Sequence, residues 1–316
     1  MKYAAKRIAT LLVTMVVVSF LAFVAFDLIS GDPAEIMLGT QATPEALEAL
    51  REELGLNRPL LVRYADWLTG FVTGDLGMSY QYFQPVGELL GAKIVLTLLL
   101  SAISFVLIVV VSIPVGVWFA PKSGGIGGGA RATANQLFMA IPPFFTGMLL
   151  SQVFGVILHW FVPGDFPDLA ANPGGAMKYL LLAAIAIAIP RIAMTVRMLR
   201  STIRGELRKL YVRTAISRGN DRPAVLRRHV LRNALVPVVS FLAQTMAEIV
   251  AGGIVVEQVF GIPGLGRMLV VSIANRDYPV VQAIVVILVF WVVLAGTLAD
   301  LINSRIDPRL NLGGDA

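Results

Sequence analysis

Few residues in this chain of 316 amino acids could carry out covalent chemistry. The sequence has no cysteine, so it can form neither a thiol nucleophile nor a cysteine metal site. Its two histidines, His159 and His229, are distant in the sequence, and neither belongs to a metal-binding pattern such as H-E-x-x-H. The glycine run 124–129 lacks the Gly-Lys-Ser/Thr of a phosphate-binding loop and is interpreted as a flexible loop. Without a cluster of catalytic side chains, the sequence argues against an enzyme.

Two ionisable residues lie inside apolar runs. Glu248 lies well inside the run 234–256, and Arg191 follows Pro190 within the span that contains the run 178–199. A charge at the centre of a bilayer costs about 2.5–3.5 kcal/mol on insertion scales, so both side chains should face the bundle interior or water. We expect a polar contact in a translocation path, or alternatively an ion pair that fixes helix packing.

The main concentration of charge is the basic segment 197–237. Five semi-apolar residues recur at helical spacing and form one face: Leu199, Ile203, Leu207, Tyr211 and Thr214. Six basic residues fill the other faces: Arg200, Arg204, Arg208, Lys209, Arg213 and Arg218. Gly219 can end this helix, and Asn220 or Asp221 can cap a second one with Pro223 in its first turn. The segment is predicted to be a helix, a glycine break and a helix.

The composition indicates that these residues belong to a membrane protein. The chain is 57% hydrophobic and 15% charged, with a mean hydropathy of +0.77. A helix rises about 1.5 Å per residue, so about 20 apolar residues cross a hydrocarbon core of about 30 Å. Six runs reach this length: 8–29, 95–119, 135–158, 178–199, 234–256 and 280–302. The sequence therefore predicts an all-α integral membrane protein with six transmembrane helices.

The first run is longer than the apolar region of a signal peptide, and no cleavage site follows Ser30, so we expect it to be retained. Prolines inside the next three runs free backbone carbonyls, which favours a packed, mobile bundle over a passive anchor. These prolines are Pro114, Pro142, Pro143 and Pro190.

Basic residues predict the orientation, with both termini cytoplasmic. Of 26 Lys and Arg residues, 19 fall in four segments on one side: 1–7, 121–134, 191–233 and 303–316. This juxtamembrane bias explains the net charge of +6 without a nucleic-acid partner.

The largest segment on the other side, 31–94, is predicted to form a small extracytoplasmic helical cap. Thr43 can cap a helix that begins at Pro44 and stops at Gly55. A second helix is expected over 59–69, with Gly70 as its stop. The remaining domains are predicted to be helix 1 within 1–30 and a core over 95–316 with a cytoplasmic loop 200–233. A buried re-entrant turn is expected over 261–279.

Short motifs surround the basic segment in a fixed order. Its central motif is Tyr211-Val212-Arg213-Thr214-Ala215 followed by Gly219. Seven others accompany it: Gly31-Asp32-Pro33, Leu54-Gly55-Leu56-Asn57-Arg58-Pro59, Gly74-Asp75-Leu76-Gly77, Arg232-Asn233-Ala234-Leu235-Val236-Pro237, Gly261-Ile262-Pro263-Gly264-Leu265-Gly266, Asn275-Arg276-Asp277-Tyr278-Pro279 and Asp307-Pro308-Arg309. With these motifs the chain resembles, over nearly its whole length, the ABC-transporter permeases of the dipeptide/oligopeptide/nickel family. Arg213 in place of Glu, and 17 residues between Gly219 and Pro237, are departures usual for the peptide subfamily.

The resemblance implies a type I ABC importer-like permease, in which a short helix docks on an ATPase. The implied coupling residues are Tyr211, Arg213, Thr214, Ala215 and Gly219. The implied outer gate and docking surface for a binding protein comprises Gly261, Pro263, Gly264, Asp277 and Tyr278. Alternatively, the basic helix could simply rest on anionic lipid, and the outer turn could be an ordinary connecting loop.

The resemblance also implies the partners. These are a second homologous permease, two ATP-binding subunits that carry ATP and Mg, an extracytoplasmic substrate-binding protein and membrane lipid. No cofactor is expected on the chain itself. The expected location is a bacterial or archaeal cytoplasmic (inner) membrane. The expected cargo is di- or oligopeptides, with nickel chelates or glutathione as alternatives, and a secondary transporter driven by an ion gradient through Glu248 is the competing class.

Overall fold

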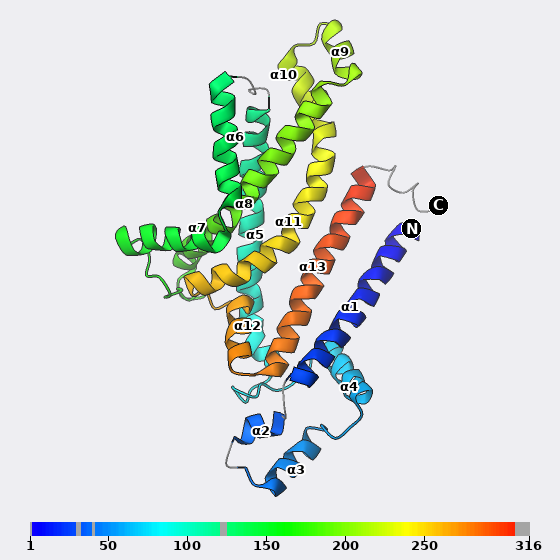
Figure 1. Cartoon of the computed structure of the whole chain (residues 1–316), viewed down its shortest axis with the longest axis vertical. Helices are drawn as coiled ribbons and strands as arrows, with labels where there is room; N and C mark the ends of the chain where they lie inside the picture. Colours follow the sequence, from blue (N-terminus) through cyan, green and yellow to red (C-terminus); the bar gives the residue numbers. More distant parts are fainter. Residues whose placement is uncertain (1, 30–32, 40–41, 121–124, 307–316) are drawn as a thin grey trace.

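The computed structural model describes residues 2–29, 33–39, 42–120 and 125–306. Within these ranges the regular elements are helices, and no strand is formed beyond the isolated bridge between Met78 and Pro85. The long helices lie along the long axis of an elongated molecule (Figure 1). Three residues of the sequence motifs, Gly31, Asp32 and Gly124, and the closing motif Asp307-Pro308-Arg309 lie outside the described residues.

Five helices are long and apolar enough to cross a membrane, which confirms five of the six predicted runs. They are α1 (Lys2–Ile29), α5 (Val86–Phe119), α8 (Pro173–Leu207), α11 (Leu231–Phe260) and α13 (Tyr278–Ile306). α11 continues, without a break in the helical backbone, from α10 (Arg222–Val225) and the π-helical η2 (Leu226–Val230). Several helices exceed the predicted runs, because their more polar ends still pack on neighbouring helices. α5, for example, begins at Val86 rather than Val95.

The third predicted run, 135–158, does not form one straight helix. α6 (Gly125–Ala140) ends before two consecutive prolines, and α7 (Pro143–Leu150) and the π-helical η1 (Ser151–Ile157) continue at an angle of 93°. Pro142 is extended, with ψ of 145°, because a residue before proline is disfavoured in the helical region. α7 therefore projects sideways from the bundle (Figure 1).

The predicted glycine loop is also corrected, because residues 125–129 form the first turns of α6. Glycine accepts helical dihedrals, and α6 gains packing against α8. In contrast, Pro114 and Pro190 lie inside the continuous helices α5 and α8, as expected for prolines within a packed bundle.

Helix α8 is the centre of the bundle. α5, α6, α7 and α11 all pack against it. Five of its small or apolar residues are almost fully buried: Ala183, Ala184, Ala186, Ile187 and Ala188. Small residues let helix backbones approach closely within a membrane, so they favour this central position. At one edge α1 packs on α13, and Arg7 Nη1 lies 3.0 Å from Asp300 Oδ2.

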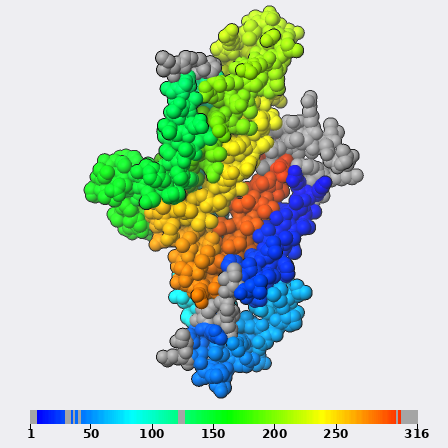
Figure 2. Space-filling view, in the orientation of Figure 1, coloured from blue at the N-terminus to red at the C-terminus, as the bar shows by residue number. Residues whose placement is uncertain are grey.

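A cap of short helices lies at one end of the molecule (Figure 2). It comprises α2 (Pro33–Leu38), α3 (Pro44–Glu53) and α4 (Leu60–Thr73). Thr43 Oγ1 accepts a hydrogen bond from Ala46 N at 3.3 Å, which confirms the predicted start of α3. α4 does not stop at Gly70. It ends at Thr73, and Gly74 follows as a left-handed cap with a φ of +93°. The chain then folds back, so the Asp75 carbonyl would lie 3.0 Å from a Cβ on Gly70.

The predicted turn 261–279 contains a short helix, α12 (Leu265–Ala274), at the same end as the cap (Figure 1). Its ten residues are too few to cross a membrane. Leu265 and Met268 are buried in a second apolar cluster with Val86 of α5 and Ile284 of α13. The turn therefore packs against the ends of α5 and α13, and this agrees with the expectation that it is buried in protein.

We expect Gly116→Leu to destabilise the bundle. A Cβ at Gly116 would lie 2.8 Å from Leu199 Cδ2 and 3.2 Å from Leu199 Cβ, and Leu199 is fully buried. Overpacking of this kind costs about 1–3 kcal/mol. The measurement is the melting temperature in detergent. The matched control is Gly205→Leu in α8, where a Cβ meets no atom within 4 Å. Equal melting of both variants would contradict the predicted contact.

Candidate functional site

The basic segment forms an elbow, residues 208–221, at the end of the molecule opposite the cap (Figure 2). α8 ends at Leu207, Lys209 is extended with ψ of 152°, and a separate helix α9 (Leu210–Ser217) follows. The prediction of one continuous helix before Gly219 was therefore wrong. The chain turns between α8 and α9, where Lys209 Nζ donates to Glu206 Oε1 at 2.5 Å. Helical spacing alone does not reveal this break.

Helix α9 is attached to both long helices that flank it. Tyr211 donates its hydroxyl hydrogen to Glu206 Oε2 of α8 at 2.7 Å and accepts from Asn233 Nδ2 of α11 at 3.3 Å. The Tyr211 hydroxyl is protonated at neutral pH, and burial raises its pKa further above its usual value. Val212 is 2% exposed and belongs to the same buried cluster as Ile203. A displacement of α9 must therefore act on α8 and α11 together.

The turn after α9 confirms the predicted glycine break. Gly219 has a φ of +88°, which an L side chain rarely adopts, and a Cβ there would meet no atom within 4 Å. Asn220 Nδ2 donates to the Ala215 carbonyl at 2.9 Å. Asp221 Oδ1 accepts from Ala224 N at 3.2 Å, so Asp221 caps the next helix with Pro223 in its first turn.

The outer face of the elbow is exposed and chemically mixed. Four polar residues of α9 and its C-cap are exposed: Arg213, Thr214, Ser217 and Arg218. Two apolar side chains accompany them, Leu210 at 76% and Ile216 at 41% exposed. Among the described residues, Arg213 forms no ion pair. Apolar and positive groups side by side suit contact with another protein. The predicted coupling residues thus lie together, with Tyr211 facing inward and Arg213 and Gly219 facing outward.

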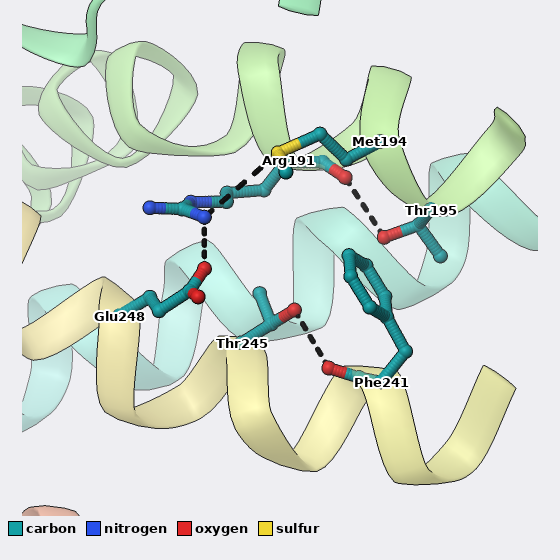
Figure 3. A network of polar contacts seen from close by, with 6 residues as sticks. All are labelled: Arg191, Met194, Thr195, Phe241, Thr245 and Glu248. Atoms are coloured by element: carbon teal, nitrogen blue, oxygen red, sulfur yellow. Dashed lines mark hydrogen bonds and ion pairs between the residues drawn. The ribbon is translucent and has the colours of Figure 1, made fainter. Parts of the chain in front are cut away.

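Arg191 and Glu248 form an ion pair between α8 and α11 (Figure 3). Their side chains are 20% and 36% exposed. Thr195 Oγ1 donates to the Arg191 carbonyl at 2.8 Å. The predicted pairing is confirmed, and it satisfies two charges that would otherwise be costly inside an apolar bundle.

A second carboxylate, Glu257, is fully buried at the cap end of α11. It accepts hydrogen bonds from Thr97 Oγ1 at 2.6 Å, Gly266 N at 2.7 Å and Arg267 N at 3.2 Å. Leu265 N donates to Thr97 Oγ1 at 2.8 Å. Together Glu257 and Thr97 satisfy the free N–H groups of the first turn of α12, where a negative charge is also favoured by the helix dipole.

This carboxylate explains the glycine motif beside it. A Cβ on Gly264 would lie 2.4 Å from the carboxylate of Glu257, and a Cβ on Gly266 would lie 2.4 Å from Ile254 Cα and 3.0 Å from Glu257 Oε2. The two glycines therefore let this motif pack closely against the Glu257 side chain and α11. Sequence analysis missed Glu257, because it comes directly after the predicted run 234–256. An acidic residue in a still apolar stretch was the available signal.

Asp277 is also fully buried. Its Oδ2 accepts from Ser79 Oγ at 2.5 Å and its Oδ1 from Tyr80 N at 3.0 Å, which ties the start of α13 to the loop before α5. Burial raises the pKa of the Tyr80 hydroxyl to about 12, and the nearby Asp277 adds to this shift while Arg63 opposes it.

The predicted outer-gate residues all lie around α12. Gly261 and Gly264 are buried like Asp277, whereas Pro263 and Tyr278 are partly exposed. Gly261, Gly264 and Asp277 can support a gate, but another protein could not contact them because they are buried. Of these five residues, Pro263 and Tyr278 are the ones that could form part of a docking surface.

The fold and this site define a multi-pass membrane protein whose polar groups link its helices to one another. Residues 112–312 match the family described as "Binding-protein-dependent transport system inner membrane component", and residues 1–85 match the N-terminal part of such membrane components. The chain belongs to this family. It is a permease subunit of an ABC transporter.

Curated relatives match almost end to end. A "Probable peptide ABC transporter permease protein y4tP" of Sinorhizobium fredii is 32% identical, over 98% of each chain. The "Oligopeptide transport system permease protein AppB" of Bacillus subtilis is 36% identical, over 93% of this chain and 94% of that protein. The "Glutathione transport system permease protein GsiC" of Escherichia coli is 32% identical, over 98% of this chain and 99% of that protein.

A solved structure shares the fold. A chain of the inward-facing MetNI methionine ABC transporter superposes with a TM-score of 0.56 at 20% identity, over 69% of this chain and 96% of that chain. The shared fold agrees with the predicted all-α permease architecture.

We expect Glu257→Gln to lower the stability of the protein. An amide keeps one acceptor oxygen, but its NH₂ group would face backbone N–H donors, and an unsatisfied buried donor costs about 1–3 kcal/mol. The measurement is the melting temperature in detergent, with Glu53→Gln on exposed α3 as the control. A Glu257→Gln variant as stable as the wild type would show that the carboxylate is dispensable.

For the pair in Figure 3 we expect a double-mutant cycle to show coupling. Arg191→Met and Glu248→Met should each destabilise, because each leaves one charge unpaired, and the double variant should recover about 0.5–3 kcal/mol. Additive losses would mean that the pair does not contribute to stability. Normal transport by a stable double variant would assign the pair to helix packing, whereas lost transport would assign it to the pathway.

Proposed function

We propose that the chain is one of two permease subunits of an ATP-driven importer for short peptides in a bacterial or archaeal cytoplasmic (inner) membrane. Relatives that are named peptide and oligopeptide permeases, and that align over nearly their full length, support this substrate class. The family description supports delivery of the peptide by a binding protein. ATP and Mg would be bound by two partner ATPases and not by this chain.

We propose six crossings with both termini cytoplasmic, counting α6 and the α7–η1 segment as one bent crossing. The start of α1 and the end of α13 lie side by side, joined by Arg7 and Asp300, and both point towards the elbow end (Figure 1). The basic elbow carries the strongest cytoplasmic signal in the sequence. The cap and α12 would then face the opposite side, where a binding protein docks.

The observation that carries the proposal is the attachment of α9. It is short and exposed, and Tyr211 connects it to both α8 and α11. A partner ATPase that grips Arg213, Thr214 and the turn at Gly219 would pull two pore helices at once. The sideways projection of α7 supports the second permease, because it exposes large apolar side chains. These are Phe144, Phe145, Met148 and Leu149.

The alternatives rank lower. Glutathione is itself a short peptide, and the relative named as a glutathione permease is about as similar as those named for peptides. Nickel chelates have no comparable support. A carrier driven by an ion gradient would need a free acidic ligand in the membrane, whereas Glu248 is paired with Arg191.

We expect Gly219→Leu to uncouple ATP hydrolysis from transport. The φ of +88° disfavours any side chain, and one would project into the open space that a partner would occupy. In proteoliposomes with the partner subunits, peptide taken up per ATP should fall about tenfold, equivalent to about 1.4 kcal/mol of coupling. Gly205→Leu is the control. Unchanged transport by an assembled Gly219→Leu complex would refute the coupling role.

A further inference from the structure

Two arginines near the elbow end of α8, Arg200 and Arg204, have N–H groups without hydrogen-bond partners in the described part of the chain. Three of their nitrogens are buried without a hydrogen-bond partner: Arg200 Nε, Arg204 Nε and Arg204 Nη2. Among the described residues, neither side chain forms an ion pair. The positive charges of Arg204 and Arg131 both act on the Arg200 guanidinium. Buried donors without a protein partner, beside further positive charges, are features of an anion-binding site.

An apolar groove leads away from these arginines. It has a volume of about 370 Å³ and lies between α5, α6 and α8, with Val111, Phe138 and Val196 among its walls. Val111 and Phe138 are exposed, so the groove is open to the side of the bundle. Arg131 lines it too, and the Arg131 guanidinium lies 5.9 Å from the centre of the Phe119 ring. Arg200 lies about 6 Å further along α8 than Val196, at about 1.5 Å per residue.

We propose that this groove binds one anionic phospholipid. One of its two acyl chains lies between α5, α6 and α8, and its phosphate accepts hydrogen bonds from Arg200 and Arg204, with Arg131 at the side. Guanidinium groups bind phosphate oxygens in pairs of parallel hydrogen bonds, and basic pockets between transmembrane helices hold anionic head groups.

The lining of the groove favours a lipid over a peptide. A peptide backbone would need polar partners along the groove, because an unsatisfied amide is costly there. The amide of Asn135 is the polar group available besides Arg131 among the described lining residues, and it already donates to the Ala193 carbonyl at 2.9 Å. An acyl chain requires no such partners.

The test is native mass spectrometry of the assembled transporter, titrated separately with dioleoyl phosphatidylglycerol, dioleoyl phosphatidylcholine and glycerol phosphate. We expect one tight phosphatidylglycerol per copy of this chain, with binding weakened about tenfold or more in Arg200→Gln/Arg204→Gln. The matched control is Arg227→Gln/Arg228→Gln, which removes the same charge from two exposed positions of the same basic segment. Ala134→Trp tests the groove alone, because it fills the acyl position and leaves every charge in place.

Loss of phosphatidylglycerol in Arg200→Gln/Arg204→Gln and in Ala134→Trp, with retention in the control, supports the site. An equal loss of phosphatidylglycerol in the control would show that the lipid binds any basic surface of the protein, and would overturn the proposal. Equal binding of phosphatidylcholine would overturn it, as would glycerol phosphate binding as tightly as the lipid. A loss of peptide transport with unchanged lipid binding would assign the arginines to the peptide pathway instead. Gel filtration confirms that each variant is assembled.

Discussion

The connection between α8 and α11 is the constraint on which the rest of the structure depends. Side chains join these helices at three levels, from the cap end to the elbow. The linked residues are Tyr179 with Phe260, Arg191 with Glu248, and Glu206 with Asn233 through Tyr211. The levels are about 18 and 22 Å apart along α8, at about 1.5 Å per residue. Arg191 and Glu248 lie within the apolar runs, where a charge needs a partner, and with three such links the two helices are expected to move as one body.

This arrangement suits the permease subunit of a transporter, whose helices must move together. The elbow lies at one end of the joined helices, and α12 is fastened to α11 at the other through Glu257. A movement at α9 therefore has a continuous path of packed helices and hydrogen bonds to the opposite end. α12 in turn packs on α5 and α13, so the remaining helices are engaged through their contacts with this central pair.

The buried acidic residues show how polar groups organise the cap end. Glu257 and Asp277 each lie without exposure, and each accepts hydrogen bonds from a segment distant in the sequence. Removing a carboxylate from water is unfavourable unless donors surround it, so each acid requires its loop to adopt one conformation. Gly264 leaves room for the carboxylate of Glu257, and Gly266 leaves room for the backbone of Ile254, so this short motif has a specific packing role.

The sequence alone determined that this is a membrane protein of this family with five of its long helices. It also determined the start of α3 at Thr43 and the break at Gly219. These follow from local composition and spacing, because apolar length and turn chemistry act over a few residues. The bend at Pro142-Pro143, the break at Lys209 and the left-handed cap at Gly74 involve residues close in the sequence, but apolar length and helical spacing do not report them. Tertiary structure alone decided the burial of Glu257 and Asp277, because it depends on contacts between residues far apart in the chain. Thr97 contacts Glu257 and Ser79 contacts Asp277, and no periodicity in a single segment reports such contacts.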